Sequence, residues 1–242
     1  MSHRARRYLA EFLGTGLLVM VVVGSGIAAQ TLSTDVGLEL LENALATAGG
    51  LAVLILIFGP ISGAHFNPVV SLADWWLGRS SNRGLTGREL LPYATAQTTG
   101  AIGGAILANV MFAKSAVARS HHHRSSPHLL LGELVATVGL LLVIFALAKS
   151  ERTGQTPWAV GAYIGGAYFF TSSTSFANPA VTVGRAFTNT FAGIAPVSVP
   201  GFVLAQLLGG VTALGLLAAL YPSGETAADD VVVPHRERSV RA

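Results

Sequence analysis

The chain has no cysteine and few charged residues, and both shortages restrict what it can be. Without cysteine there are no disulfides, no thiolate chemistry and no cysteine-ligated metal or iron–sulfur sites. Only 11% of the 242 residues are charged, whereas a soluble domain carries about a quarter. Because 51% of the residues are hydrophobic, the composition indicates a protein that lies largely in lipid.

The hydrophobic residues fall into six stretches that qualify, or nearly qualify, as membrane spans. A span needs roughly 20 mostly apolar residues. Two further segments, 59–78 and 172–192, contain proline and are too short to cross a bilayer, which is typical of re-entrant loops with short half-helices. We therefore expect an all-α membrane protein with six transmembrane helices and two half-helices. The expected spans are about 8–29, 38–58, 89–113, 129–149, 157–171 and 198–221.

Lysine and arginine are distributed unevenly between the two sides of these spans. One side collects eleven basic residues and the other four, Arg185 included. Because basic loops favour the cytoplasmic side, we expect an inner (plasma) membrane protein with both termini in the cytoplasm. Most of the basic residues flank the expected spans. The net charge of +3 therefore follows from membrane topology, and we expect no nucleic acid as a partner. Residues 1–221 form one expected domain, and the polar segment 222–242 is an expected disordered cytoplasmic tail.

The second half of the chain repeats the first. Three motifs recur in the same order, 122, 109 and 111 residues apart. Each half has three spans, so the second half enters the membrane upside down, with the site expected at the midplane where the halves meet. Repeat one covers about 8–113 and repeat two about 129–221. The matched motifs are Glu11 with Glu133, Gln97 with Gln206, and Asn67-Pro68-Val69 with Asn178-Pro179-Ala180.

The two Asn-Pro pairs have a physical logic at the start of short helices. Asparagine is a favourable N-cap, and proline fits the first helical position because its missing N–H would be unpaired there. Two half-helices that enter from opposite faces would place their positive ends near the bilayer centre. There they would repel cations, while the amides of Asn67 and Asn178 donate to the oxygen of a passing solute. This pattern predicts a pore for neutral solutes with a barrier to protons and cations.

The same residues resemble a known family. The segments Ser62-Gly-Ala-His65-Phe-Asn67-Pro68-Val69-Val70 and Phe176-Ala-Asn178-Pro179-Ala180-Val181 are similar to the paired Asn-Pro-Ala boxes of the major intrinsic proteins, the aquaporins and aquaglyceroporins. The resemblance covers about Tyr8 to Tyr221, and Val69 replaces the usual alanine of the first box. It implies passive conduction of small neutral solutes, one pore per subunit and a homotetramer.

The family's selectivity constriction, aligned by distance from the two boxes, falls on Thr47, Gly166, Ser175 and Val181. Most family members have arginine at the place of Val181, and water-selective members generally add an aromatic residue and a histidine. The resemblance therefore implies a wider, uncharged and aromatic-free constriction. Arg185 lies one helical turn further on. It either replaces part of the lost charge or has a structural role.

The expected cargo rests on a narrower resemblance. Phe-Ala-Asn-Pro-Ala-Val-Thr-Val, with Thr-Phe-Ala-Gly-Ile-Ala-Pro downstream, is similar to a bacterial branch associated with arsenic resistance. This implies permeation of neutral arsenous acid, a small polyol-like solute. Glycerol, urea and water are alternative cargoes. An ion-coupled secondary transporter and a structural protein with a vestigial pore are alternatives of other classes.

Several other polar residues have expected supporting roles. We expect Glu11 and Glu133 to accept hydrogen bonds from the re-entrant backbone, with a proton relay as the alternative. Gln97 and Gln206 are expected at polar contacts between helices. His65 is expected to support the first loop, with a pH gate as the alternative.

The chain carries no motif that points to catalysis. Phosphate-binding glycine loops, nucleophile–base pairs and metal-ligand helices are absent from the sequence. We therefore expect no enzyme activity, no cofactor and no metal. The run His121-His122-His123 is expected in a solvated outer loop, with metal binding as the alternative.

Overall fold

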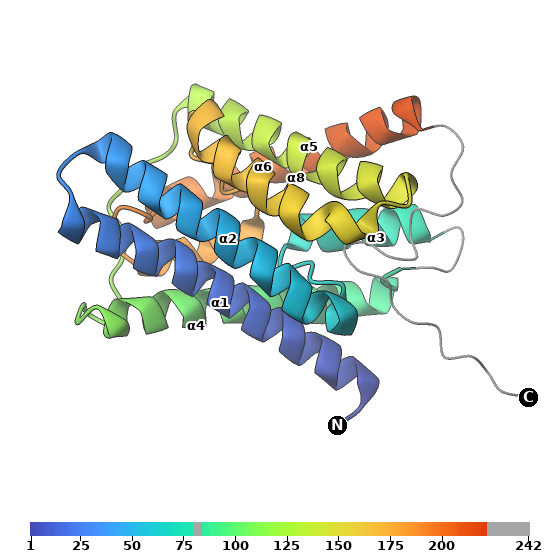
Figure 1. Ribbon diagram of the computed structural model, residues 1–242, viewed down its shortest axis with the longest axis horizontal. Coiled ribbons are helices and arrows are strands. Elements are labelled where there is room, and N and C mark those ends of the chain that lie inside the picture. The colour runs from blue at the N-terminus through green and yellow to red at the C-terminus, as the bar shows by residue number, and fades with distance from the viewer. Residues whose placement is uncertain (80–83, 222–242) are drawn as a thin grey trace, which may run out of the picture.

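The computed structural model describes residues 1–79 and 84–221 and folds them into a helical bundle (Figure 1). The predicted tail, 222–242, lies outside the described residues. Short 3-10 turns occur at Thr153–Gln155, Arg185–Phe187 and Pro196–Ser198. The α-helices are α1 (His3–Leu32), α2 (Val36–Ser62), α3 (Pro68–Gly78), α4 (Gly87–Met111), α5 (Pro127–Lys149), α6 (Thr156–Phe170), α7 (Pro179–Gly184) and α8 (Val199–Leu220).

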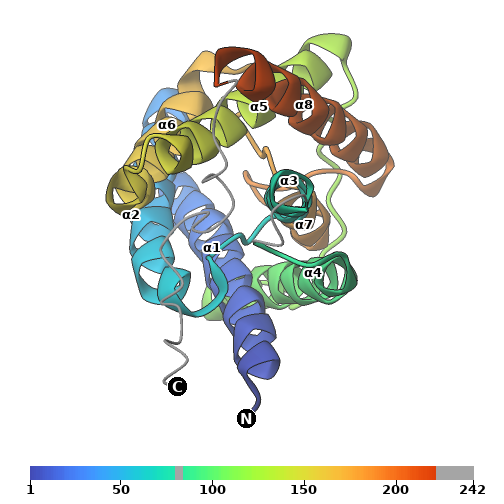
Figure 2. The ribbon, with the colours of Figure 1, turned by 90° about the vertical axis from the view of Figure 1, so that its right-hand side faces the viewer.

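The predicted all-α architecture is confirmed, and the described part of the chain forms six long helices around two short ones. The half-helices α3 and α7 lie inside the bundle and come from its opposite ends (Figures 1 and 2). The start of α1 and the end of α8 lie at the same end of the bundle. Some boundaries differ from the expectation, because α1 already begins at His3 and α2 runs past 58 to Ser62. It ends at Gly63, whose φ of 88° is a left-handed conformation that glycine adopts without strain.

Not every long helix reads as a membrane span by itself. Length and composition alone qualify α1, α2, α5 and the segment Pro196–Leu220. Helix α6 has 15 residues, about 22 Å, and α4 begins with Arg88 and Glu89 and carries several threonines and glycines. Both belong to the bundle through their packing, since α4 contacts α1 and α6 contacts α2 and α5.

Helix packing follows the internal repeat. The contacts of α1 with α4 and α2 in the first half recur as contacts of α5 with α8 and α6 in the second. Each half-helix contacts both α4 and α8, so α3 and α7 join the two halves. Figure 2 shows these two half-helices together between α4 and α8.

Glycine allows the closest helix contacts. A Cβ atom at Gly100 or Gly104 of α4 would collide with the backbone of α1, at the carbonyls of Phe12 and Gly16. At Gly209 of α8, the repeat equivalent of Gly100, a Cβ would lie 2.7 Å from the carbonyl oxygen of Leu134. Small residues let helix backbones approach this closely in lipid.

We predict that Gly104→Ala destabilises the protein by about 1–3 kcal/mol, because the added methyl group forces α4 away from α1. The matched control is Gly103→Ala, where a Cβ meets nothing within 4 Å. The measurement is the thermal unfolding midpoint of the detergent-solubilised proteins. Equal midpoints for the two variants would contradict the close contact.

Candidate functional site

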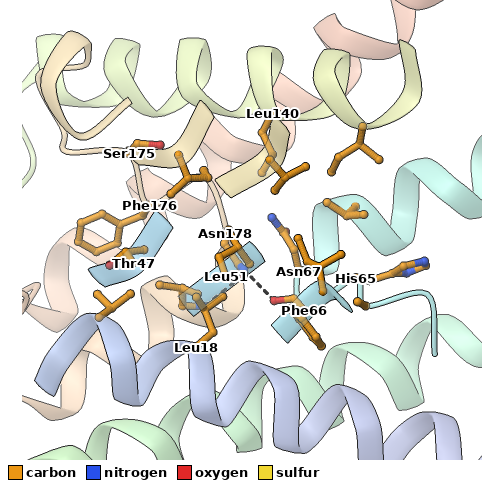
Figure 3. A pocket seen from close by; sticks show the side chains of 18 of the residues that line it. Leu18, Thr47, Leu51, His65, Phe66, Asn67, Leu140, Ser175, Phe176 and Asn178 are labelled. Carbon is orange, nitrogen blue, oxygen red and sulfur yellow. Dashed lines mark hydrogen bonds between the residues drawn. The ribbon is translucent and has the colours of Figure 1, made fainter. Parts of the chain in front are cut away.

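A narrow cavity lies between the re-entrant loops and the long helices. Its volume of about 60 Å³ leaves room for only a few water-sized molecules at a time. In Figure 3, Ser175, Phe176 and Thr47 lie at one end of the cavity, and His65 lies at the other. Asn67 and Asn178 lie between them, where the two loops meet.

The cavity wall is aliphatic and follows the same twofold repeat as the fold. Four helices contribute two aliphatic side chains each, and the two are always four residues apart, which places them on one helix face. The offsets between halves are again 122 and 109 residues. The pairs are Leu18 and Val22 on α1 with Leu140 and Ile144 on α5, and Leu51 and Ile55 on α2 with Val160 and Ile164 on α6.

Both Asn-Pro boxes begin a half-helix. The side-chain oxygen of Asn67 accepts a hydrogen bond from the N–H of Val69 at 2.9 Å, and that of Asn178 accepts from the N–H of Ala180 at 2.9 Å. The N-cap residues are extended, with φ of −152° and −159°. Each cap therefore fixes the orientation of its own amide. The first helical positions are occupied by Pro68 and Pro179.

The two asparagines also connect the loops to each other. Asn67 Nδ2 donates to the carbonyl of Ala177 at 2.7 Å, and Asn178 Nδ2 donates to the carbonyl of Phe66 at 2.7 Å (Figure 3, the latter dashed). A side-chain amide carries two N–H groups. One N–H of each asparagine therefore holds the opposite loop, and the second can donate to a solute in the cavity that both residues line.

Both loops hold non-glycine residues in the left-handed conformation at equivalent positions. Phe66 and Ala177, directly before the asparagines, have φ of 50° and 48°. Ala64 and Ser175, three residues before them, have φ of 48° and 49°. Each such residue costs of order 1–3 kcal/mol and persists only where its surroundings over-determine it.

Glu11 provides that constraint for the first loop. Its carboxylate accepts the backbone N–H groups of His65 at 3.0 Å and Phe66 at 2.7 Å, the Ser62 hydroxyl at 2.6 Å and the Gln97 amide at 2.7 Å. The side chain is fully buried. Backbone polar groups at membrane depth need partners within the protein, and this carboxylate supplies them.

Glu133 does the same for the second loop. It accepts the N–H groups of Phe176 and Ala177, both at 2.8 Å, and the Gln206 amide at 2.6 Å. Gln206 also donates to the Thr182 hydroxyl at 2.9 Å, as Gln97 donates to that of Ser71 at 3.0 Å. The two networks are related by the inverted repeat, and in both the glutamate is used as an acceptor for the loop.

His65 combines a buried support with a place in the cavity lining. Its Nδ1 lies 3.0 Å from the Ser71 hydroxyl, and its Nε2 lies 3.8 Å from an Asp74 carboxylate oxygen. The ring packs against Tyr93, with the centroids 5.4 Å apart. These contacts fix the imidazole where the first loop meets the pore.

The predicted constriction residues are only partly together. Thr47, Ser175 and Val181 line the cavity, but Gly166 is exposed on the outer face of α6. The geometry of the α-helix explains why Gly166 does not reach the cavity. Ile164 and Tyr168 share the cavity face of α6, and Gly166, midway between them, points about 160° away from each. Tyr168, and not Gly166, is the residue at this end of α6 that lines the cavity, and its hydroxyl lies 3.2 Å from the Thr47 hydroxyl.

This end of the cavity also has charged and aromatic side chains in its lining. Phe176, Tyr168 and Arg185 line it together with Ser175 and Val181. The sequence contained a signal for Arg185, which follows Val181 by one helical turn. The sequence contained no signal for Tyr168. The turns after α6 decide which of its residues reach the cavity, and their course cannot be read from residue spacing.

The loop between α4 and α5 covers this end of the second half. Its backbone pairs with the segment after α7, where the N–H of Ser120 donates to Ala186 at 3.2 Å and the N–H of Ala195 donates to His122 at 2.8 Å. Burial, followed by the charges of Arg124 and His121, lowers the pKa of His122. Among the described residues, no three His, Cys, Asp or Glu side chains gather as metal ligands.

Six packed helices, an inverted repeat and two capped half-helices meeting at a narrow cavity define a multi-pass membrane channel. The sequence model described as the major intrinsic protein family matches residues 1–175. The chain therefore belongs to the major intrinsic protein family, whose members are channels and not enzymes.

Individual relatives agree with this assignment. The chain is 51% identical to the aquaglyceroporin AqpS of Rhizobium meliloti (strain 1021), over 88% of both chains. It is 30% identical to the glycerol uptake facilitator protein of Pseudomonas aeruginosa, over 80% of this chain and 77% of that one. The solved aquaglyceroporin of Plasmodium falciparum has the same fold, with a TM-score of 0.73 at 22% identity over 90% of this chain and 98% of that one.

We predict that Glu133→Gln lowers the free energy of unfolding by about 1–3 kcal/mol. The amide has only one acceptor oxygen, so a buried N–H of the second loop loses its partner. The thermal midpoint in detergent measures the effect, and Glu151→Gln, at an exposed position, is the control. A midpoint as high as that of the control would show that the loop does not depend on this carboxylate.

Proposed function

We propose that this channel conducts small neutral polyhydroxy solutes passively, arsenous acid and glycerol above all, with some water. The observation that supports this cargo is the composition of the cavity lining. Its wall is aliphatic, and its hydrogen-bond donors are confined to the asparagines and the ends. A solute with hydroxyl groups can exchange water for these donors, whereas a cation would lose its hydration without an opposite charge in return.

The short side chain of Val181 in the cavity lining supports a cargo of the size of a small polyol. It lines the cavity, as Ser175 does, and most family members have arginine at this position. A short apolar side chain leaves room there and does not bind water. Two relatives have names that point the same way, an aquaglyceroporin and a glycerol uptake facilitator.

We also propose an inner-membrane homotetramer with both termini in the cytoplasm. The excess of basic residues on the side of the termini supports the orientation. The outward faces of α2 and α6 support burial in lipid or against other subunits, because they expose large apolar side chains. These include Leu41, Leu45, Ile57, Trp158, Phe169 and Phe170.

We predict fast, non-saturating flux of arsenous acid into proteoliposomes at neutral pH. The reference is protein-free liposomes, and intraliposomal arsenic is measured over time. Background flux with a folded protein would refute this cargo and leave glycerol, urea or water. Accumulation against the gradient, driven by protons or sodium, would instead establish a coupled transporter.

We further predict that Val181→Arg cuts arsenous acid flux about tenfold, equivalent to about 1.4 kcal/mol in barrier height, and water flux less. The long side chain narrows the cavity for the larger solute. Val181→Met separates bulk from charge. Equal loss of both fluxes, or no loss, would count against a constriction at this residue.

A further inference from the structure

Arg185 is a buried arginine in the cavity lining, and most of its hydrogen-bond donors have no partner among the described residues. The residue is 2% exposed and lies directly after α7. Its Nε donates to the carbonyl of Ala192. Within residues 1–79 and 84–221 this is its one side-chain hydrogen bond, and it forms no ion pair there. A guanidinium has five N–H donors, so the four on its terminal nitrogens are left to the cavity.

Its neighbour Arg124 provides an internal comparison. Arg124 donates from Nε to Gly193 at 3.0 Å, and its terminal nitrogens lie 3.5 Å from the carbonyls of Ser173 and Phe191. All three of its nitrogens thus tie the outer loop to the second half, and it does not line the cavity. Arg124 is a structural residue, whereas Arg185 forms a side-chain hydrogen bond from one nitrogen only among the residues that the structure describes.

An aromatic ring fixes the position of the Arg185 charge. The guanidinium carbon lies 3.4 Å from the centroid of the Phe176 ring, which in turn packs edge-on against Phe202 at 5.1 Å. A ring face attracts a cation without neutralising it. The positive charge is therefore rigidly placed and still felt in the cavity, which Val181 and Ser175 also line.

Ser175 faces the same space. Its hydroxyl oxygen is buried and finds no hydrogen-bond partner among the residues that the structure describes. An unpaired buried hydroxyl and free guanidinium donors in the lining of one cavity form a polar set that a solute oxygen and hydroxyl can satisfy together.

We propose that Arg185 contacts the solute and excludes cations in this pore. It lies one helical turn after Val181 and supplies the charge that Val181 lacks. Its terminal nitrogens donate to the oxygens of neutral hydroxylated solutes, and its charge repels protonated amines and metal cations. This inference rests on the channel activity proposed above and assigns the specificity of the same cavity.

The test compares variants in proteoliposomes by two readouts, glycerol or arsenous acid flux and the leak of sodium and methylammonium. Arg185→Met keeps the length and removes the charge. We expect its cation leak to rise about tenfold or more, since a fixed charge a few ångströms away acts strongly in a poorly hydrated pore. Arg185→Lys keeps the charge but loses the planar donors, so it should exclude cations and conduct solutes several-fold more slowly.

Two further variants separate charge from folding. Arg119→Met removes an arginine at an exposed position of the loop between α4 and α5 and should leave both readouts unchanged. Val181→Arg combined with Arg185→Met moves the charge by one turn and should restore cation exclusion.

The outcomes are decisive in each direction. An unchanged cation leak in an inserted, conducting Arg185→Met protein would overturn this inference and leave the proposed function intact. If Arg185→Met fails to insert, Arg185→Lys decides, because a conducting lysine variant that leaks cations contradicts a role for the charge. Absence of solute flux in the unmodified protein would instead refute the proposed function itself.

Discussion

The pore depends on two buried carboxylates that accept consecutive backbone N–H groups. Glu11 holds the first re-entrant loop and Glu133 the second, each together with a glutamine from a neighbouring helix. Irregular backbone at membrane depth is stable only when its polar groups have partners in the protein. Once the N–H groups are satisfied, the left-handed residues can be held, and the asparagines reach the cavity. Most helical bundles could supply an aliphatic wall, but without such acceptors the loops would not be stable.

Much of this arrangement could be predicted from the sequence, because the repeat carries it. The offsets that relate Glu11 to Glu133 and Gln97 to Gln206 also relate the wall residues, so Leu18 corresponds to Leu140 and Leu51 to Val160. Residues on regular helices keep their phase. The order of motifs was therefore enough to predict the inverted architecture and the position of both half-helices.

The constriction could not be predicted as well, because it lies where regular structure ends. Counting back from Asn178 to α6 passes through the turns between 171 and 177, and these decide which face of α6 meets the cavity. Gly166 and Tyr168 are two residues apart and point to nearly opposite sides. The proposed role of Arg185 likewise depends on the ring of Phe176, and the position of this ring follows from a strained loop. Neither is a property of residue spacing.

The crossed bonds from Asn67 to Ala177 and from Asn178 to Phe66 have a consequence for biogenesis. While only the first half of the nascent chain is in the bilayer, the Phe66 carbonyl lacks its partner, and the centre of the channel is incomplete. Closure has to wait until α7 is inserted. A shorter protein made of a single repeat could build the same centre only by inserting in both orientations and pairing two oppositely oriented copies.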